Sequence, residues 1–193
     1  MPENKVQFGL SKAAFAPYTV VGDVVTFETP ILIPGAVSLT LDPRGELTEF
    51  YADNILYFVA SSNQGYDATL EIATIPQQFA IDALGETLDE EDGVVTEYAD
   101  AQGKPFAFMF QFEGDVKATR HVLFNCTANR PSISGSTKTN STEPGTNELT
   151  LVASPIEIDG KLIVKTKTVA STTPAIYDAW YTSVYKKVAI PAG

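Results

Sequence analysis

Residues 106–112 read FAFMFQF, and this stretch decides the fold class of the chain. Its phenylalanines recur at every second position: Phe106, Phe108, Phe110 and Phe112. A period of two is typical of a β-strand, and four exposed phenylalanines would promote aggregation, so we expect all four to share one buried face. The chain then turns at Glu113-Gly114-Asp115 into a second predicted strand, residues 118–128 (ATRHVLFNCTA).

Turn-forming residues separate further β segments on both sides of this strand. Gly22-Asp23 lies between two pairs of valines, and a dipeptide of this kind closes a tight hairpin. Asp159-Gly160 joins residues 148–158 to residues 161–169 in the same way. Residues 42–45 (DPRG) have the residue preferences of a type I turn. The sequence therefore predicts a mainly antiparallel β protein.

A long hairpin is predicted over residues 46–74. Its first arm carries aromatic and apolar residues: Phe50, Tyr51, Leu56, Tyr57 and Phe58. We expect the turn at residues 61–65 (SSNQG) and the return strand at residues 66–74 (YDATLEIAT). Arms of this length exceed the usual strand of about 5–6 residues, so the hairpin could reach beyond its own core.

One helix is predicted, from Pro76 to Leu84. Proline suits the first helical turn, and Gly85 suits the position after the last turn. The apolar residues of the segment fall on one face at three- and four-residue spacing: Phe79, Ala80, Ala83 and Leu84. We expect Phe79 and Leu84 to pack on the sheet. Residues 174–187 have a pattern that fits either a short helix or a strand.

Two segments contain too few apolar residues to pack in a core. Residues 86–104 begin with the acidic run ETLDEEDG, and residues 129–147 are almost entirely polar. We expect both to be disordered or arm-like, because neither buries enough apolar surface to offset the entropy lost on ordering. Together these patterns predict a β protein with one principal helix and long arms.

The composition fits a single domain, residues 1–193. Of the 193 residues, 44% are hydrophobic and 19% are charged. The sequence contains no apolar run near the roughly 18 residues that span a membrane, and its first ten residues lack signal-peptide features. We therefore expect a soluble protein that is not secreted. Cys126 is the only cysteine and His121 the only histidine, which excludes intramolecular disulfides and disfavours cysteine- or histidine-based metal centres.

Charge is distributed unevenly along the chain. The net charge of −11 argues against a protein that grips nucleic acid through its phosphates, because that mode needs a basic face. Residues 82–115 carry a net charge of −9, whereas residues 116–193 carry +4. An ordinary solvated surface accounts for this asymmetry, and so does self-association through two unlike faces.

No motif in the sequence indicates catalysis, a cofactor or a metal. His121 lies in mid-strand with no nucleophile motif to activate, so we interpret it as a structural histidine. Cys126 has the parity of Val122 and Phe124 and is interpreted as a small buried hydrophobic residue. Residues 89–93 lack the ligand spacing of a calcium-binding loop, and we interpret them as a solvated loop. We expect no enzyme activity.

Several short motifs occur in a fixed order along the chain. They are PGAVSL at residues 34–39, YADNI at 51–55, GY at 65–66, LEIA at 70–73, IP at 75–76, ATRHVL at 118–123 and NCTA at 125–128. Together they resemble the major tail proteins of long-tailed phages that infect Gram-positive bacteria. The likeness covers nearly the whole chain and is least distinctive in residues 86–104, in residues 129–147 and in the last dozen residues.

The resemblance implies a tail-tube protein, with a β-sandwich or barrel, one flanking α-helix, a long hairpin and extended loops. It implies hexameric rings that stack into a hollow tube through which the genome passes during ejection, with no catalytic site, cofactor or metal. The implied partners are other copies of the chain and other tail proteins: the tape measure, the tail terminator and the distal tail protein. DNA would pass without sequence-specific binding, and no membrane is involved. The implied location is the virion, after assembly in the host bacterial cytoplasm.

By this resemblance, the long hairpin joins a continuous inner barrel. Residues 46–75 contain no Lys or Arg and so would add no attractive contact to DNA phosphates. The candidate inner-tube residues are Glu46, Glu49, Phe50, Tyr51, Ala52, Asp53, Asn54, Ile55, Tyr57, Asp67 and Glu71. Alternation puts Tyr51 and Tyr57 on one side of the strand. Phe50 and Phe58 lie on the other, and which side faces the lumen stays open.

The charge asymmetry supplies a second set of candidate residues. A tube is built from contacts between unlike faces, so acidic residues of one subunit would meet basic residues of the next. The candidates for this inter-subunit contact are Asp89, Glu90, Glu91, Asp92, Lys161, Lys165 and Lys167. Such charges steer the encounter of subunits more than they supply affinity.

A monomeric binding module is the alternative function. A β-sandwich that presents Tyr51, Tyr57, Tyr66 and Trp180 on one face would bind a carbohydrate or a peptide. The two functions differ in the size of the purified protein. A binding module stays small at high concentration, whereas a tube protein forms rings or filaments.

Overall fold

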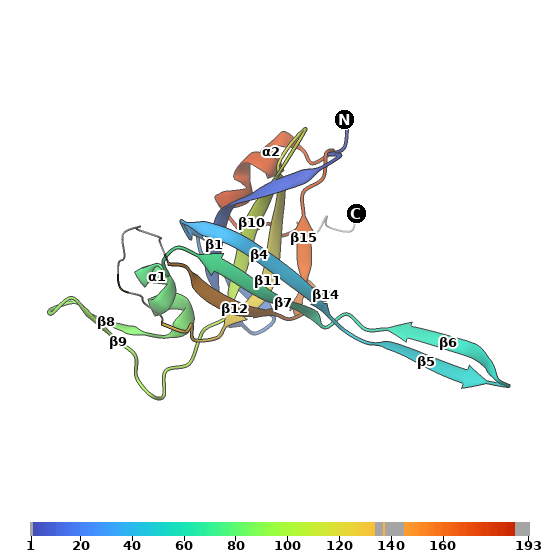
Figure 1. Cartoon of the computed structure of the whole chain (residues 1–193), viewed down its shortest axis with the longest axis horizontal. Coiled ribbons are helices and arrows are strands. Elements are labelled where there is room, and N and C mark those ends of the chain that lie inside the picture. The colour runs from blue at the N-terminus through green and yellow to red at the C-terminus, as the bar shows by residue number, and fades with distance from the viewer. Residues whose placement is uncertain (1, 134–136, 138–144, 188–193) are drawn as a thin grey trace.

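The computed structural model describes residues 2–133, 137 and 145–187. Its main element is a nine-stranded sheet whose principal strands follow the order β2 (Val24–Phe27), β1 (Gln7–Val21), β10 (Phe106–Gly114), β11 (Thr119–Ala128), β12 (Asn147–Ala153), β7 (Gly65–Ile72) and β4 (Ala36–Arg44). β15 (Lys165–Lys167) also pairs with β11, and β3 (Ile31–Leu32) pairs with β1. All strand pairings in the described part of the chain are antiparallel, so the mainly β fold is confirmed (Figure 1).

Three small hairpins and two helical segments complete the fold. The hairpins are β5 (Leu47–Ala52) with β6 (Ile55–Ser61), β8 (Thr87–Asp89) with β9 (Val94–Thr96), and β13 (Ile156–Ile158) with β14 (Lys161–Ile163). The helical segments are α1 (Gln77–Phe79) continued by the π-helical turn η1 (Ala80–Leu84), and α2 (Pro174–Asp178) continued by the 3-10 turn η2 (Ala179–Tyr181).

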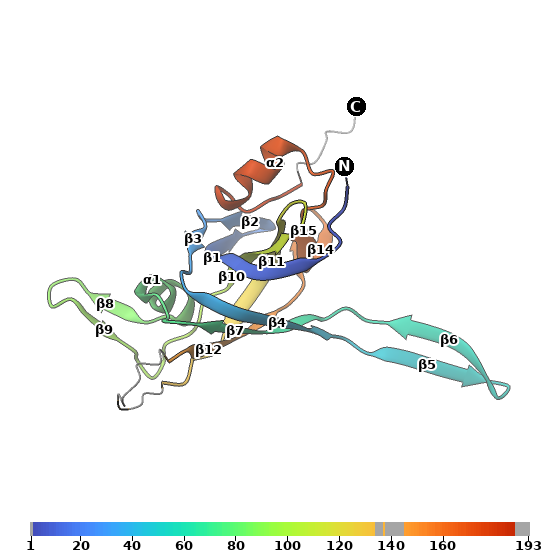
Figure 2. The same cartoon turned by 45° about the horizontal axis from the view of Figure 1, so that its top comes forward.

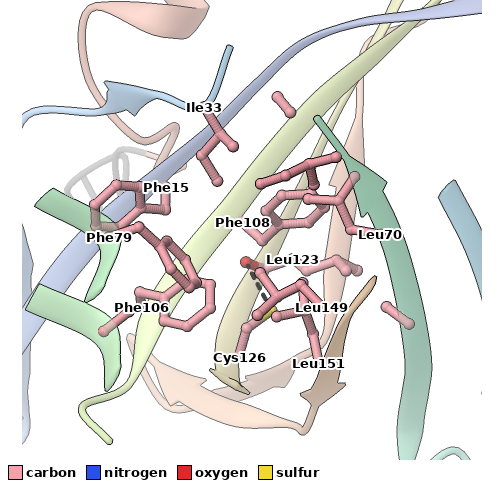
Figure 3. Packing of buried hydrophobic residues seen from close by; sticks show 14 of the residues in the cluster. Phe15, Ile33, Leu70, Phe79, Phe106, Phe108, Leu123, Cys126, Leu149 and Leu151 are labelled. Carbon is pink, nitrogen blue, oxygen red and sulfur yellow. Dashed lines mark hydrogen bonds between the residues drawn. The ribbon is translucent and has the colours of Figure 1, made fainter. Parts of the chain in front are cut away.

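A separate hydrophobic core lies on each face of β10. The sheet curls so that β4 comes beside β1, and the first core fills the curve together with α1 and η1 (Figure 3). Its largest buried side chains are Phe15, Leu70, Ile72, Phe79, Phe106, Phe108, Phe110, Leu123, Leu149 and Leu151. The second core packs between the other face of the sheet and the α2–η2 segment: Ala14, Ala16, Val25, Ala107, Met109, Val122, Phe124, Ile158, Trp180 and Val184.

The phenylalanines of β10 share one face, as predicted. Three of them are fully buried, and Phe112 is partly buried at the edge of the first core. Phe106 makes edge-to-face contacts with Phe15 and Phe79, whose ring centroids lie 6.1 and 5.3 Å from its own. This geometry adds to the stabilisation that burial alone provides.

Cys126 lies on a different face from the one its parity predicts. In the β10–β11 pairing, Phe108 lies opposite Leu123 but Phe106 lies opposite Cys126, so β11 contains one extra residue between these pairs. A bulge of this kind reverses the alternation of side chains beyond it. Cys126 therefore joins Leu123 in the first core, whereas Val122 belongs to the second.

The predicted helix is confirmed as a helical segment, with a change of pitch. It begins after Pro76 as an α-helical turn and continues as a π-helical turn that ends at Gly85, whose φ is 84°. All four apolar residues predicted for its inner face are buried, and Phe79 and Leu84 pack in the first core, as expected. Gly85 is required here, because a Cβ at this position would strike the carbonyl oxygen of Gln102.

Residues 174–187, for which the sequence allowed a short helix or a strand, contain a helix. Pro174 begins α2, and no residue from 174 to 187 lies in a strand. Trp180 is buried in the second core, and its indole Nε1 donates to the backbone oxygen of His121 at 3.5 Å. The guanidinium of Arg120 lies 3.7 Å from the ring centroid of Tyr177, which fixes the helix to the sheet through a cation–π contact.

Two of the predicted hairpin turns are confirmed and one predicted turn is wrong. Gly22-Asp23 joins β1 to β2, and Asp159-Gly160 joins β13 to β14 with φ values of 51° and 73°. Residues 42–45 form no turn. Their first three residues continue β4, and Pro43 and Arg44 pair with Tyr66 and Gly65 of β7. β4 lies at the edge of the sheet, where the missing N–H of a proline is tolerated.

The long hairpin exists, but its turn lies elsewhere. The tip is at Asp53-Asn54, between β5 and β6, and residues 62–64 instead lead from β6 into β7. Asp53 and Asn54 have φ values of 50° and 61°, the two left-handed conformations of a type I′ turn. The left-handed region tolerates Asp and Asn better than most residues, so the turn forms there and not at residues 61–65.

The first of the two polar segments, residues 86–104, contains a hairpin. Residues 87–96 form the β8–β9 hairpin, which projects from the body as an arm (Figures 1 and 2). The carboxylate of Asp89 accepts hydrogen bonds from the amides of Glu91 and Asp92, at 2.9 and 3.1 Å, and so closes the turn without apolar packing. Of residues 129–147, positions 134–136 and 138–144 lie outside the described residues.

Candidate assembly surfaces

One hairpin extends far beyond both hydrophobic cores. β4 and β7 pair within the body, and their continuations β5 and β6 pair outside it. Figures 1 and 2 show this hairpin projecting along the longest axis of the molecule. We call residues 47–61 the β5–β6 arm.

Two glycines shape the base of the β5–β6 arm. Gly45 and Gly65 have φ values of 147° and 103°, and a Cβ on either would collide with a carbonyl oxygen, of Ser62 and Ala153 respectively. The Glu46 amide donates to the Ser62 hydroxyl at 3.0 Å, which ties the two strands of the arm together. The arm therefore leaves the body through a defined connection.

The strands of the arm are not in uniform register. Phe50 lies opposite Phe58, whereas Tyr51 lies opposite Leu56, so Tyr57 has no cross-strand partner. Cross-strand partners point to the same face, which places the rings of Phe50 and Phe58 together. The bulge also breaks the simple alternation used to assign faces from the sequence.

Large apolar side chains cover the arm and remain exposed to solvent. Tyr57 is 70% exposed, and Phe50 and Phe58 are 56% and 59% exposed. The full set is Leu47, Phe50, Tyr51, Ile55, Leu56, Tyr57, Phe58 and Val59. Contiguous apolar surface of this kind marks an interaction site on a soluble protein.

The charges on the arm are all negative. The arm carries Glu49 and Asp53, with Glu46 just before it, and no Lys or Arg occurs between Arg44 and Lys104. The Tyr51 hydroxyl donates to the Glu49 carboxylate at 2.8 Å, and this hydrogen bond raises the pKa of Tyr51. The remaining sites Ala52, Asn54 and Ile55 lie at or beside the tip.

Asp67 and Glu71 belong to the body and not to the arm. They lie in β7, on the face of β4, β7 and β12 that points away from the first core. We call this the outer face of the β4–β7–β12 sheet, formed by Ser38, Thr40, Asp42, Arg44, Asp67, Thr69, Glu71, Glu148, Thr150 and Val152. Hydrogen bonds from Thr146 and Ser38 lower the pKa of Glu71, so this carboxylate stays ionised.

The two sets of candidate inter-subunit charges lie far apart within one chain. Asp89, Glu90, Glu91 and Asp92 occupy the tip of the β8–β9 hairpin. Lys161, Lys165 and Lys167 lie in β14 and β15, toward the end of the body from which the β5–β6 arm leaves, whereas β8–β9 projects from the other end (Figures 1 and 2).

Lys165 and Arg130 are among the basic residues that already have partners within the chain. Lys165 donates to the hydroxyl of Tyr66 at 2.9 Å and lies 4.3 Å from the centroid of its ring. Arg130 pairs with Glu97 at 2.5 Å. Lys161 and Lys167 are exposed, so they are better placed than Lys165 to meet a neighbouring molecule.

The only histidine and cysteine are buried in unreactive surroundings. His121 stacks on Phe110 with ring centroids 4.9 Å apart, and burial lowers its pKa to about 4. The thiol of Cys126 is fully buried and contacts the backbone oxygen of Leu123 at 3.9 Å (Figure 3), and burial raises its pKa to about 12. Neither residue faces a hollow that could hold a substrate.

The aromatic residues considered for a binding module do not form one surface. Tyr51 and Tyr57 lie on the β5–β6 arm, Trp180 is buried in the second core, and Tyr66 is half-buried beneath Lys165. A search of the described residues for three or more clustered His, Cys, Asp or Glu side chains finds no candidate metal site. None of the helices in the described part of the chain has the length and apolarity needed to cross a bilayer.

Part of the arm was missed by sequence reasoning. Four residues are exposed on it but were not among the predicted inner-tube residues: Leu47, Leu56, Phe58 and Val59. The signal that could have found them is the dipeptide Asp53-Asn54, whose residue types favour a two-residue hairpin loop. Placing the tip there makes residues 47–52 and 55–61 the two strands of the arm.

No protein-family model matches the chain, and no curated protein matches its sequence. A solved structure to which the chain is similar is the anti-feeding prophage cap, a tube-terminating cap determined by cryo-EM. The two chains are 15% identical, the alignment covers 88% of this chain and 97% of that chain, and the TM-score is 0.48. A likeness at this level does not identify a function.

Proposed function

We propose that the chain is a structural subunit that assembles with copies of itself into a tube of the phage-tail type, built from stacked hexameric rings. The observation that carries the proposal is the β5–β6 arm, which holds eight large exposed apolar side chains and no basic residue. The motif order that resembles major tail proteins supports the same assembly. In this role the chain is no enzyme, and its place is the virion.

The energy of one arm contact favours an assembly in which each subunit makes several such contacts, and not an isolated dimer. Fully burying a large apolar side chain contributes about 1.5–3 kcal/mol. The eight side chains of the arm are already partly covered, so their burial supplies on the order of 10 kcal/mol, which is comparable to the cost of association, about 4–15 kcal/mol. One arm contact is therefore marginal alone, whereas a ring or tube repeats the contact around each subunit.

The unlike ends of the molecule favour head-to-tail assembly. The β5–β6 arm and the acidic β8–β9 hairpin project from opposite ends of the longest axis (Figure 1). A two-fold dimer would bring identical patches together, whereas heterologous contacts join different patches and generate rings or filaments. Lys167 would then meet the acidic hairpin of another subunit, which carries Glu90 and Glu91 at its tip.

The outer face of the β4–β7–β12 sheet is the candidate wall of the lumen. The opposite face of these strands packs in the first core, so it has no side chains free to line a channel. Most of this face offers carboxylates and hydroxyls, such as Thr69 and Glu71, and its cation, Arg44, is paired with Asp67 at 3.6 Å. The face would therefore hold DNA phosphates only weakly, and the genome would slide past it. Within a virion the tube would also contact other tail proteins at its two ends.

Electron microscopy of the concentrated protein tests this function. Negative-stain images of the wild type should contain rings or tubes. The double variant Phe50→Ser/Phe58→Ser should remain small in sedimentation while keeping its unfolding midpoint, because these side chains support no core. Val94→Ser/Tyr98→Ser is a matched control, since these residues are 55% and 56% exposed but lie outside the arm. Wild-type protein that stays monomeric at high concentration would sink the proposal.

A further inference from the structure

A hollow of about 340 Å³ opens on the second-core side of the molecule. Its walls are mainly apolar, with Phe124, Ile158, Ile163 and Tyr185 among them. Three lysines stand around it, Lys161, Lys186 and Lys187, against one carboxylate, that of Asp159. The hollow therefore combines an apolar interior with a basic rim.

The other hollows have a different character. The one beside the N-terminal segment is lined largely by polar residues such as Asn4, Gln7 and Thr119. A second lies on the outer face of the β4–β7–β12 sheet among hydroxyls and carboxylates, and a third, beside η1, contains Glu86 and Glu90 against the single cation of Lys104. None of these three suits an apolar, acidic partner.

We propose that the hollow ringed by these lysines receives the Phe50–Phe58 pair of the β5–β6 arm from a second copy of the chain. The inference rests on the proposed self-assembly and names the surface on which the arm docks. The arm is complementary to the hollow. Its exposed aromatic rings suit the apolar walls, and its charges, which are all negative, suit the basic rim. Opposite charges on the two surfaces steer the encounter of subunits and disfavour binding of the arm to acidic surfaces.

The geometry of the arm suits such an insertion. Phe50 and Phe58 lie opposite each other across β5 and β6, so both rings enter from one face of the hairpin. A cavity of about 150 Å³ already holds a benzene ring, so a hollow of about 340 Å³ has room for two. The chain's own arm does not fill it, because that arm points away from the body (Figure 2).

Two of the lysines are available to meet the arm. Lys161 and Lys187 are exposed, whereas Lys186 donates to the backbone oxygen of Val25 and lies 5.2 Å from the ring centroid of Phe27. On the arm, Glu49 points to the face opposite Phe50, because successive side chains of a strand alternate, and its carboxylate accepts a hydrogen bond from Tyr51. The arm's other carboxylate is Asp53, which lies in the tip turn and would reach the rim together with the inserted pair. The pair of Asp53 and Lys161 is therefore the sharpest point for a test.

A charge-reversal cycle tests the pairing. Asp53→Lys and Lys161→Glu should each raise the protein concentration at which tubes appear by about 3- to 10-fold. The double variant Asp53→Lys/Lys161→Glu should return it to within about twofold of the wild type. Rescue is the decisive result, because two unrelated structural defects would add instead of cancelling. A double variant worse than either single variant would overturn the inference.

Disulfide trapping gives an independent readout on the same contact. Proteins carrying Phe58→Cys and Lys161→Cys are mixed, assembled and mildly oxidised, with Glu91→Cys on the β8–β9 hairpin as the control partner. The native Cys126 is fully buried and does not compete. A covalent dimer should form between the Phe58→Cys and Lys161→Cys proteins. No covalent dimer should form between the Phe58→Cys and Glu91→Cys proteins.

The outcomes separate the docking surface from the assembly itself. Tubes that form normally but link Phe58→Cys to Glu91→Cys, or to neither partner, overturn the docking surface and leave the proposed function standing. A wild type that forms no tubes overturns both proposals.

Discussion

β10 and the β5–β6 arm are both rich in phenylalanine and other large apolar residues, but only those of β10 are buried. In β10, three phenylalanines at alternate positions are fully buried between neighbouring strands and the α1–η1 segment. In the arm, Phe50 and Phe58 pair across two strands and remain more than half exposed. The difference lies in what surrounds each strand. β10 has a layer on each face, and the arm has none.

This difference shows where the chain is incomplete as a monomer. A lone two-stranded hairpin is marginally stable in water, and its exposed rings gain nothing from remaining there. The apolar residues of β10 stabilise the fold of one subunit. Those of the arm, in the function proposed above, stabilise contacts between subunits.

The largest expected effect separates the two regions by stability. Phe108→Ala should reduce the free energy of unfolding by about 3–5 kcal/mol, because it leaves a cavity in the first core. Phe58→Ala in the arm of the monomer should change it by no more than about 0.5 kcal/mol. Denaturant titration of both variants measures the contrast. A loss below about 1 kcal/mol for Phe108→Ala would show that β10 is not central.

Acid should weaken the body through His121, which stacks on Phe110. Because burial lowers the pKa of His121 from 6.5 to about 4, the unfolded chain binds a proton more readily than the folded one between these values. Stability should therefore be complete above about pH 6.5 and fall by about 2–3 kcal/mol as the pH drops to about 4. The variant His121→Phe should lose this part of the pH dependence in denaturant titrations. An unchanged slope between pH 4 and 6.5 would contradict the assignment.

A smaller effect is expected at the tip of the arm. Asn54→Val places a β-branched residue at a φ of 61°, which costs roughly 1–2 kcal/mol of hairpin stability. If the arm must be folded to bind, the concentration needed for tube formation should rise about 5- to 30-fold. Asn54→Gly is the control, because glycine adopts this conformation without strain. Equal behaviour of the two variants would show that the tip turn does not matter for assembly.

The smallest effect concerns the charges at the two ends. Exposed ion pairs contribute about 0–1 kcal/mol each, and at about 1 M salt the screening length falls to roughly 3 Å. Tube growth should therefore slow as salt rises, while finished tubes persist through their apolar contacts. Time-resolved light scattering across a salt series measures the growth rate. A rate that stays constant or rises with salt would remove the electrostatic steering.

Local patterns predicted much of the body. Phe106 to Phe112 defined the central strand, the spacing of Phe79 and Leu84 defined the helical segment, and Asp159-Gly160 defined a turn. Each of these features depends on residues that are neighbours in the sequence. The chemistry of a period or a turn dipeptide is therefore sufficient to identify it.

Features that depend on distant partners were harder to predict. The bulge that moves Cys126 into the first core is visible only in the pairing of β10 with β11. Pro43 continues a strand because β7 lies beside it, although the residues around it prefer a turn. The hollow beside Lys161 gathers residues from positions 124 to 187, and no spacing in the sequence indicates that they meet.

Hydrogen exchange, measured on the free subunit and on assembled protein, tests the contrast between the two regions most directly. Amides of β10 should exchange slowly in both samples, because two cores cover them at all times. Amides of residues 47–61 should exchange quickly in the free subunit and become strongly protected on assembly. Arm amides that exchange at the same rate in both samples would contradict the account.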